Sequence, residues 1–467
     1  MDIAKIIRNI SYSLVGNLVS VLGSILMILI VPKYISVGDY GAWQLFLFYF
    51  SYVGFFHFGW EDGIYLRYAG QKYEELDHKL ISGQVLGIVI LQLILALLLI
   101  TYSSIWIEDI TKKVILYFVA IAMIFTNFNN LCSFILQITA RISLYARMIS
   151  VEKIVLLFTA LIALIMGFRD YNALLIGKII SLVSVSIIGY WGIKPLLVKN
   201  VDSIGSILKE ASINIKVGSK LMLANIASML ILGIIRYGIS EGWDLVTFGK
   251  ISLTLSISNF LMIFITALGV VFFPILKQVD DNKLAEIYLL VRKALSVIFL
   301  GFLLAYYPLY IILDFWLPKY SDSLIYVAIL FPICFFESKV TLLVNTYFKS
   351  MRKENLMLKV NIIAVLFSLI LTFMSVLVFH NLTLVVLSIV LAFAFRCLLA
   401  EYFLSKILDV EVIKQVAVEL LIISMFMSLS WNVISSYAFI IYSIIYLLYI
   451  YSNRFDIFHF IKLIKKA

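Results

Sequence analysis

The stretch IVILQLILALLLI, residues 88–100, decides the class of fold. A helix rises 1.5 Å per residue, so an apolar block of about 20 residues crosses a hydrocarbon core of about 30 Å. The strands of a membrane β-barrel alternate apolar and polar side chains over about ten residues. Residues 88–100 show no such alternation, and the block around them, at about 80–105, predicts a membrane-spanning helix.

The chain contains fourteen such blocks. Its 467 residues are 63% hydrophobic and only 14% charged, which is far from the composition of a soluble domain. The blocks lie at about 10–31, 42–60, 80–105, 114–138, 151–168, 172–193, 217–237, 246–273, 294–317, 324–348, 359–380, 382–405, 413–431 and 434–451. We therefore predict an all-α integral membrane protein with about 14 transmembrane helices.

The basic residues are concentrated in every second gap between these blocks. Of the 37 Lys and Arg residues, 28 fall in one set of gaps and six in the other. The larger set includes Arg292 in a gap at 275–293 and Arg396 as the inner flank of its helix. Lys and Arg are retained on the cytoplasmic side, which predicts a multi-pass protein with both termini in the cytoplasm. The net charge of +10 then indicates contact with anionic lipid headgroups rather than with nucleic acid.

The gaps are too short for a soluble domain. The longest cytoplasmic gap, 194–216, predicts an amphipathic surface helix with Asp202 as its N-cap and with an apolar face formed by Ile204, Leu208, Ala211 and Ile215. The gap at 275–293 predicts a similar helix behind Asp281. No nucleotide-binding motif is present, so the chain is not expected to hydrolyse ATP by itself.

The sequence also contains a weak internal repeat. A shift of 208 residues brings Tyr40-Gly41 onto Phe248-Gly249 and residues 137–162 onto 345–370. Six blocks separate the matched ones, so the two halves enter the membrane in the same direction, which is a common transporter plan. We expect two parallel six-helix lobes, at 1–193 and 217–406, joined by the linker 194–216 and followed by two extra helices with a basic tail at 407–467.

Polar side chains form stripes on three of the predicted helices. The fourth block includes Asn130 and Gln137, the eighth Thr254, and the tenth Thr341 and Asn345, each in a series spaced by three or four residues. Polar groups at membrane depth either bond helices together or line a pathway. For single Ser and Thr residues helix bonding is favoured, whereas the continuous stripes favour the wall of a cavity.

Ionisable residues within the blocks are the sharper candidates for a site. A charge at the centre of a membrane helix costs about 2.5–3.5 kcal/mol on insertion scales, so each requires a partner or water. Lys178 and Arg236 can instead extend their charges to the outer surface. Lys250, Glu337 and Lys339 favour a hydrated cavity that suits an anionic solute, with Glu337 as an ion-coupling group. Glu337 and Lys339 are two residues apart and should not pair with each other.

One further candidate lies after the second block, in residues 59–68. Its glycines allow a bend, and Arg67 is either part of an interfacial anchor or a phosphate donor at the cytoplasmic mouth. No Cys/His cluster, HExxH motif or GxSxG motif occurs in the sequence. We therefore expect no metal, no cofactor and no enzyme activity.

The sequence resembles the Wzx-type polysaccharide flippases of the multidrug/oligosaccharidyl-lipid/polysaccharide exporter superfamily. The resemblance rests on VPKYISVGDYG at 31–41, FGWEDGI at 58–64 with Arg67, and LQITAR at 136–141. It implies that the chain moves undecaprenyl-diphosphate-linked oligosaccharide units from the inner to the outer leaflet of the bacterial inner membrane. The units would serve O-antigen, lipopolysaccharide or capsule synthesis, with a polysaccharide polymerase and chain-length machinery as partners.

The residue-level interpretation agrees with this resemblance. A basic cavity would hold the diphosphate, and our candidates for its cations are Lys178, Arg236, Lys250, Lys339 and Arg67. The alternatives are a lipid II flippase, a cation-coupled multidrug antiporter, and a membrane-embedded glycosyltransferase or polymerase. The first is expected to have a charged pair in its first helix, the second acidic cavity residues, and the third a large outer loop. Residues 10–31 contain no charge, the lysines within the blocks outnumber Glu337 and two extra helices follow, and the outer gaps are all short.

Overall fold

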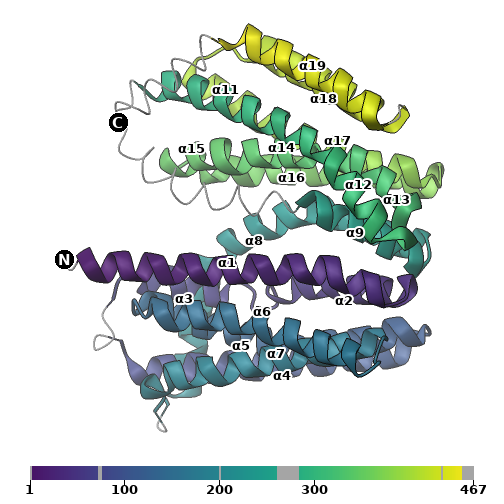
Figure 1. Cartoon of the computed structure of the whole chain (residues 1–467). Coiled ribbons are helices and arrows are strands. Elements are labelled where there is room, and N and C mark those ends of the chain that lie inside the picture. Colours follow the sequence, from purple (N-terminus) through teal and green to yellow (C-terminus); the bar gives the residue numbers. More distant parts are fainter. Residues whose placement is uncertain (1–2, 72–75, 199–200, 260–282, 433–434, 455–467) are drawn as a thin grey trace. The chain divides into compact units, whose positions relative to one another are not determined.

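The computed structural model describes residues 3–71, 76–198, 201–259, 283–432 and 435–454, and within these ranges it contains helices and no strand (Figure 1). Nine of the described helices are long and apolar enough to cross a membrane, or ten when one bent pair is counted as a single span. Each of the fourteen predicted blocks overlaps a described helix. The far part of the eighth block, the expected cap Asp281 and the basic tail lie outside the described residues.

The chain divides into two compact units, residues 1–226 and 227–467. Unit 1 contains α1 (Ile3–Tyr34), α2 (Val37–Val53), α3 (Trp60–Tyr68), α4 (His78–Trp106), α5 (Ile110–Ile138), α6 (Ile142–Ile165), α7 (Tyr171–Ile193), η2 (Lys194–Leu196) and the first part of α8 (Ile204–Gly242). Several of these helices begin after an aspartate N-cap. The carboxylates of Asp77, Asp109 and Asp170 accept hydrogen bonds from free backbone N–H groups in the first turns of α4, α5 and α7.

Unit 2 contains the rest of α8 and the helices that follow it. They are α9 (Leu245–Ser258), α11 (Leu284–Phe302), η5 (Leu303–Ala305), α12 (Tyr306–Trp316), η6 (Pro318–Tyr320), α13 (Ser321–Leu330), α14 (Ile333–Ser338), η7 (Lys339–Val344), α15 (Asn345–Ser350), α16 (Glu354–Thr372), η8 (Phe373–Val378), α17 (Leu382–Leu408), α18 (Ile413–Asn432) and α19 (Ser435–Ser452). The tenth predicted span is bent by 42° between Leu330 and Ile333, where Pro332 interrupts it. It then continues through the π-helical segment η7.

The helix boundaries follow the 208-residue repeat. Shifted by 208, the first residue of α2 falls on Leu245, where α9 begins, and the first residue of α5 falls on Pro318, where η6 begins. The last residue of α1 falls on Gly242, the end of α8. The predicted plan of two repeated sets of helices and an added pair is therefore confirmed at the level of helix order, with α18 and α19 lying outside the repeat.

The segment expected as a separate surface helix differs from the prediction. Helix α8 begins at Ile204, inside the predicted linker, and runs from there without a break through the seventh block. The Ser203 hydroxyl, rather than Asp202, accepts the hydrogen bond from the Ser206 amide. Ile204 and Leu208 of the predicted apolar face are exposed, whereas Ala211 of the same face is buried. Ile207 and Asn214 are also buried, because α8 packs closely against α4 and α3 on that side.

Candidate functional site

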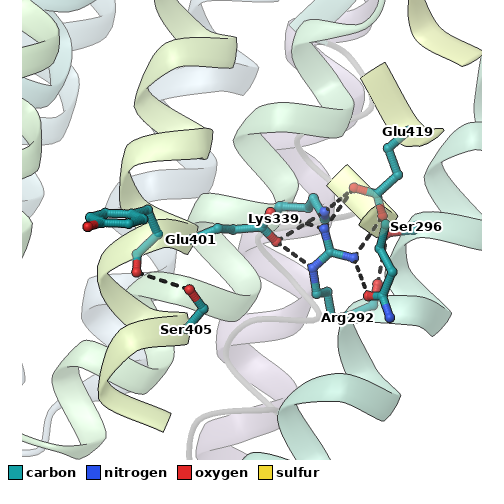
Figure 2. Close-up of polar contacts among 8 residues, drawn as sticks. Arg292, Ser296, Lys339, Glu401, Ser405 and Glu419 are labelled. Carbon is teal, nitrogen blue, oxygen red and sulfur yellow. Dashed lines mark hydrogen bonds and ion pairs between the residues drawn. The ribbon is translucent and has the colours of Figure 1, made fainter. Parts of the chain in front are cut away.

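Four charged side chains meet in the interior of unit 2 (Figure 2). Arg292 of α11 forms ion pairs with Glu401 of α17, Nε to Oε1 at 3.0 Å, and with Glu419 of α18, Nη2 to Oε2 at 2.9 Å. The Lys339 ammonium lies 3.1 Å from Glu401 Oε1 and 2.7 Å from Glu419 Oε2. We call these four residues the charge cluster. It contains two cations and two carboxylates and is therefore electrically neutral.

The charge cluster is closed to solvent. None of its four side chains is more than 4% exposed. The Ser296 hydroxyl donates to Glu419 Oε1 at 2.6 Å. Burial of charges is unfavourable unless they are paired and their remaining hydrogen-bonding groups are satisfied, and this cluster meets both conditions.

Local structure explains how four helices deliver these groups to one point. Arg292 and Ser296 are one turn apart on α11, so both face α18, and Gln415 and Glu419 are one turn apart on α18. The amide oxygen of Gln415 accepts a hydrogen bond from Arg292 Nη1 at 2.9 Å. Lys339 is the first residue of the π-helical segment, a feature that occurs frequently at functional sites.

A second ion pair lies on the other side of the bent span. Arg396 of α17 donates from Nη1 to Glu337 Oε2 at 2.8 Å, from Nε to Asn361 of α16 at 3.0 Å and from Nη2 to Ser228 of α8 at 2.9 Å. The Glu337 side chain is 20% exposed, so this pair is partly open. The prediction that Glu337 and Lys339 do not pair with each other is confirmed, since each meets a different partner.

Two arginines assigned to the cytoplasmic side therefore need correction. Arg292 is fully buried in the charge cluster rather than exposed in a gap, and Arg396 lies near the middle of α17 rather than at its inner flank. The error arose because a single arginine in an apolar helix is assigned to the nearest polar segment when its carboxylate partners are distant in sequence.

Lys178 also has a carboxylate partner. Its ammonium lies 2.6 Å from Glu152 Oε1 and 4.4 Å from the centre of the Phe50 ring, and its side chain is buried. The fifth block was expected to begin at about residue 151, but α6 begins at Ile142. Glu152 therefore lies well inside the helix instead of at its end, which allows it to reach Lys178.

The two remaining candidate cations of unit 2 are less enclosed. Lys250 of α9 lies 2.5 Å from Asp322 of α13. The lysine side chain is 22% and the aspartate 65% exposed. Arg236 of α8 donates to the Ser252 hydroxyl at 3.1 Å and lies 5.4 Å from the centre of the Phe248 ring.

Arg67 lies at a close crossing of α3 and α8 in unit 1. It forms an ion pair with Glu210 and donates to the Asn214 side-chain oxygen at 2.6 Å, while the Tyr68 hydroxyl donates to Glu210 at 2.7 Å. The crossing depends on glycine, because a Cβ atom on Gly63 would lie 2.0 Å from the Asn214 carbonyl oxygen. Arg67 therefore bonds two helices within this unit.

The predicted polar lining has mixed environments. Asn130, Gln137, Thr341 and Asn345 are half-buried, whereas Thr254 is fully buried and donates to the Ile251 carbonyl of its own helix. The buried amides of α5 are instead Asn127 and Asn129, on a neighbouring face. Their bonds to other helices, such as Asn129 Nδ2 to the Leu182 carbonyl at 3.0 Å, fit the helix-bonding interpretation.

The sequence predicted several of the buried cations but not the carboxylates that pair with them. Glu152, Glu401 and Glu419 were not singled out, although each neutralises a buried base. A usable signal was present: Glu401 and Glu419 lie within or beside apolar blocks, where a carboxylate is as costly as a lysine.

No protein-family model matches the chain, and no curated protein matches it. Among solved structures, the lipid II flippase MurJ in an inward closed conformation has a TM-score of 0.66 at 14% identity, covering 96% of this chain and 98% of its own. An inward-facing multidrug resistance MATE family transporter of the MOP superfamily has a TM-score of 0.57 at 12% identity, covering 88% of this chain and 99% of its own. The chain therefore shares its fold with these two proteins.

Proposed function

We propose that this protein is a Wzx-type flippase that moves undecaprenyl-diphosphate-linked oligosaccharide from the inner to the outer leaflet of the bacterial inner membrane by alternating access. Both termini would lie in the cytoplasm, and the translocated units would supply O-antigen or capsule synthesis. A polymerase and its chain-length machinery would act on them afterwards.

The observation that carries the proposal is the helix pair α18–α19. The flippase fold covers nearly the whole chain, whereas the multidrug transporter is matched along almost its full length and still leaves 12% of this chain uncovered. That share is close to the length of the segment after α17. Within unit 2, Glu419 joins α18 to α11 and to the bent span through the charge cluster, which supports a role for this helix in the transport fold.

We assign different roles to the exposed and the buried cations. Lys250 and Arg236 in unit 2, and Arg67 in unit 1, are partly exposed, and we propose that each can bind a diphosphate when it releases its present partner. Lys178 and Lys339 are buried against carboxylates and would have to exchange these partners to bind substrate. Both exchanges would require a change of conformation.

The neutral and acidic candidates have separate proposed roles. The half-buried side chains of Asn130 and Gln137 in unit 1, and those of Thr341 and Asn345 in unit 2, would hydrogen-bond sugar hydroxyls. Thr254 is fully buried and would do so only after a change of conformation. Glu337 would link transport to an ion gradient by releasing Arg396 when it binds a proton or cation, since its pair is the more open one.

Deletion of the gene in its own host tests the proposal. Lipid-linked repeat units should accumulate on the inner leaflet and surface polysaccharide should disappear, with both restored by the wild-type gene. Normal surface polysaccharide in the deletion strain would refute the proposed substrate.

A lipid II flippase is the second candidate, because MurJ shares the fold along 96% of this chain. In that case the deletion would cause loss of cell-wall synthesis and accumulation of lipid II, while surface polysaccharide units would not accumulate. A cation-coupled drug antiporter would instead leave both lipid-linked pools unchanged and lower resistance to toxic cations.

Lys250 offers a residue-level test. Lys250→Ala should reduce export by about tenfold, since a hydrogen bond to a charged group contributes about 1.5–3 kcal/mol, whereas Lys250→Arg should retain most of it. Lys414→Ala, at an exposed site on α18, serves as the control. If the Lys250→Ala protein is present in the membrane at the normal level and still exports fully, Lys250 does not bind the substrate.

A further inference from the structure

Unit 2 has an apolar groove between the bent span and helices α17 and α18. Its volume is about 450 Å³. One wall is formed by Leu387, Leu391 and Ala394 of α17, the other by Met427 and Trp431 of α18, and Phe336 of α14 also lines it. No charged residue is among its lining residues, so its occupant must be largely apolar.

One end of the groove has the residues of a membrane interface. The rings of Tyr326 and Trp431 lie 5.7 Å apart, and the Tyr326 hydroxyl lies 3.4 Å from the Thr383 hydroxyl. Trp and Tyr are enriched at the level of the lipid headgroups. Thr383, Trp431 and Asn432 therefore mark the end of the groove that lies at the membrane surface.

The other end of the groove lies at the depth of the charge cluster. Leu420 lines the groove, and its neighbour in sequence, Glu419, belongs to the cluster. Along α17 the groove extends from Thr383 to Ala394, which corresponds to about 17 Å of helix. One leaflet of a hydrocarbon core of about 30 Å is about 15 Å deep, so the groove has the length of one leaflet.

The size of the groove excludes a helix as its occupant. A helix with its side chains is about 10–12 Å wide, so a 17 Å length of it would occupy about 1,300 Å³ or more. The groove measures only about 1000 Å³ even when all the empty space open to its mouth is included. A single extended hydrocarbon chain is narrow enough to enter it.

We propose that this groove binds one acyl chain of a membrane phospholipid, with the ester and headgroup region beside Thr383, Trp431 and Asn432. The acyl chain fills the space between α17 and α18 in one half of the membrane. Deeper in the membrane, the charge cluster joins the same two helices. Apolar contact along the groove supplies the binding energy, and the proposal holds whichever substrate the protein carries.

Photolabelling of the full chain in lipid nanodiscs tests this site. The probe is a phosphatidylcholine with a diazirine in the middle of one acyl chain, at a low fraction among unlabelled phospholipids, and labelled peptides are identified by mass spectrometry. We expect label on residues 387–394 of α17 and 420–427 of α18. Ser424→Trp, which places an indole in the groove, should lower that label about tenfold.

Leu421→Trp is the matched control, because Leu421 is exposed on α18 but does not line the groove. It should leave the label unchanged. Equal loss in both variants, or equal labelling along all lipid-facing helices, would overturn the proposal. Labelling by a polyprenyl phosphate with the same diazirine, but not by the phospholipid, would also overturn it. Leu391→Trp, on the opposite wall, replaces Ser424→Trp if that variant does not fold.

Discussion

At matching positions of the repeat, unit 1 buries a neutral polar side chain and unit 2 buries a charged one. Gln84 of α4 and Arg292 of α11 are 208 residues apart, and both are fully buried at the centre of a polar network. Gln84 accepts a hydrogen bond from Trp60 at 2.6 Å and donates to the Ile207 carbonyl at 3.2 Å. Arg292 instead pairs with two carboxylates.

The same contrast appears at Asn129 and Glu337, which are also 208 residues apart. Asn129 forms neutral hydrogen bonds to α7, whereas Glu337 pairs with Arg396. The comparison teaches that the repeat preserves helix order but not polarity. Unit 2 tolerates two buried cations at its core because α18, which lies outside the repeat, contributes the second carboxylate, Glu419.

The largest expected effect comes from removing that carboxylate. Glu419→Gln leaves Arg292 and Lys339 with one anion between them, and an uncompensated buried charge costs about 3–5 kcal/mol of unfolding free energy. Thermal unfolding of the purified protein should show a large decrease. Glu411→Gln, at an exposed position just before α18, should leave the transition unchanged. Equal effects of the two variants would show that Glu419 is not needed to compensate the buried charges of Arg292 and Lys339.

The corresponding test in unit 1 uses shape rather than charge. Gly63→Val places a Cβ atom 2.0 Å from the Asn214 carbonyl oxygen, so α3 and α8 must separate at a cost of about 2–3 kcal/mol. The same unfolding measurement detects this loss. Gly205→Ala, where nothing lies within 4 Å, should change stability by less than about 1 kcal/mol.

A double variant sharpens the electrostatic argument. Lys339→Met combined with Glu419→Gln leaves Arg292 paired with Glu401 alone, so the buried region is neutral again. It should recover about 1–3 kcal/mol relative to Glu419→Gln. Lys250→Met combined with Glu419→Gln should recover nothing, because Lys250 pairs elsewhere. Equal recovery in both would show that charge balance is not the cause.

The smallest expected effect is at the open pair. Glu337→Gln should destabilise unit 2 by only about 1 kcal/mol, since the side chain is partly exposed and Arg396 keeps its bonds to Asn361 and Ser228. Asp322→Asn, at a more exposed pair, should show no measurable change in the unfolding temperature. A loss at Glu337 as large as that at Glu419 would remove the distinction between the two pairs.

Hydrophobic length was sufficient to predict the helices, because a membrane-spanning helix satisfies its own backbone and needs only an apolar block. The 208-residue shift was sufficient to predict their repeated order. The partners of the charges were not predictable in the same way. Arg292 and Glu419 are 127 residues apart on different helices, so their contact depends on packing that no local pattern reveals. Charge counting placed Arg292 in a cytoplasmic gap for the same reason.

We propose that the chain translocates an undecaprenyl-diphosphate-linked oligosaccharide. Purified protein in sealed vesicles, loaded with such a lipid labelled on its sugar, tests it directly through the fraction that becomes accessible to an added lectin. We expect transfer of the labelled lipid to require the protein. Lys250→Ala should reduce the transfer about tenfold, and Lys414→Ala should leave it unchanged. Transfer at the rate of protein-free vesicles, with lipid II or a toxic cation moved in its place, would contradict it.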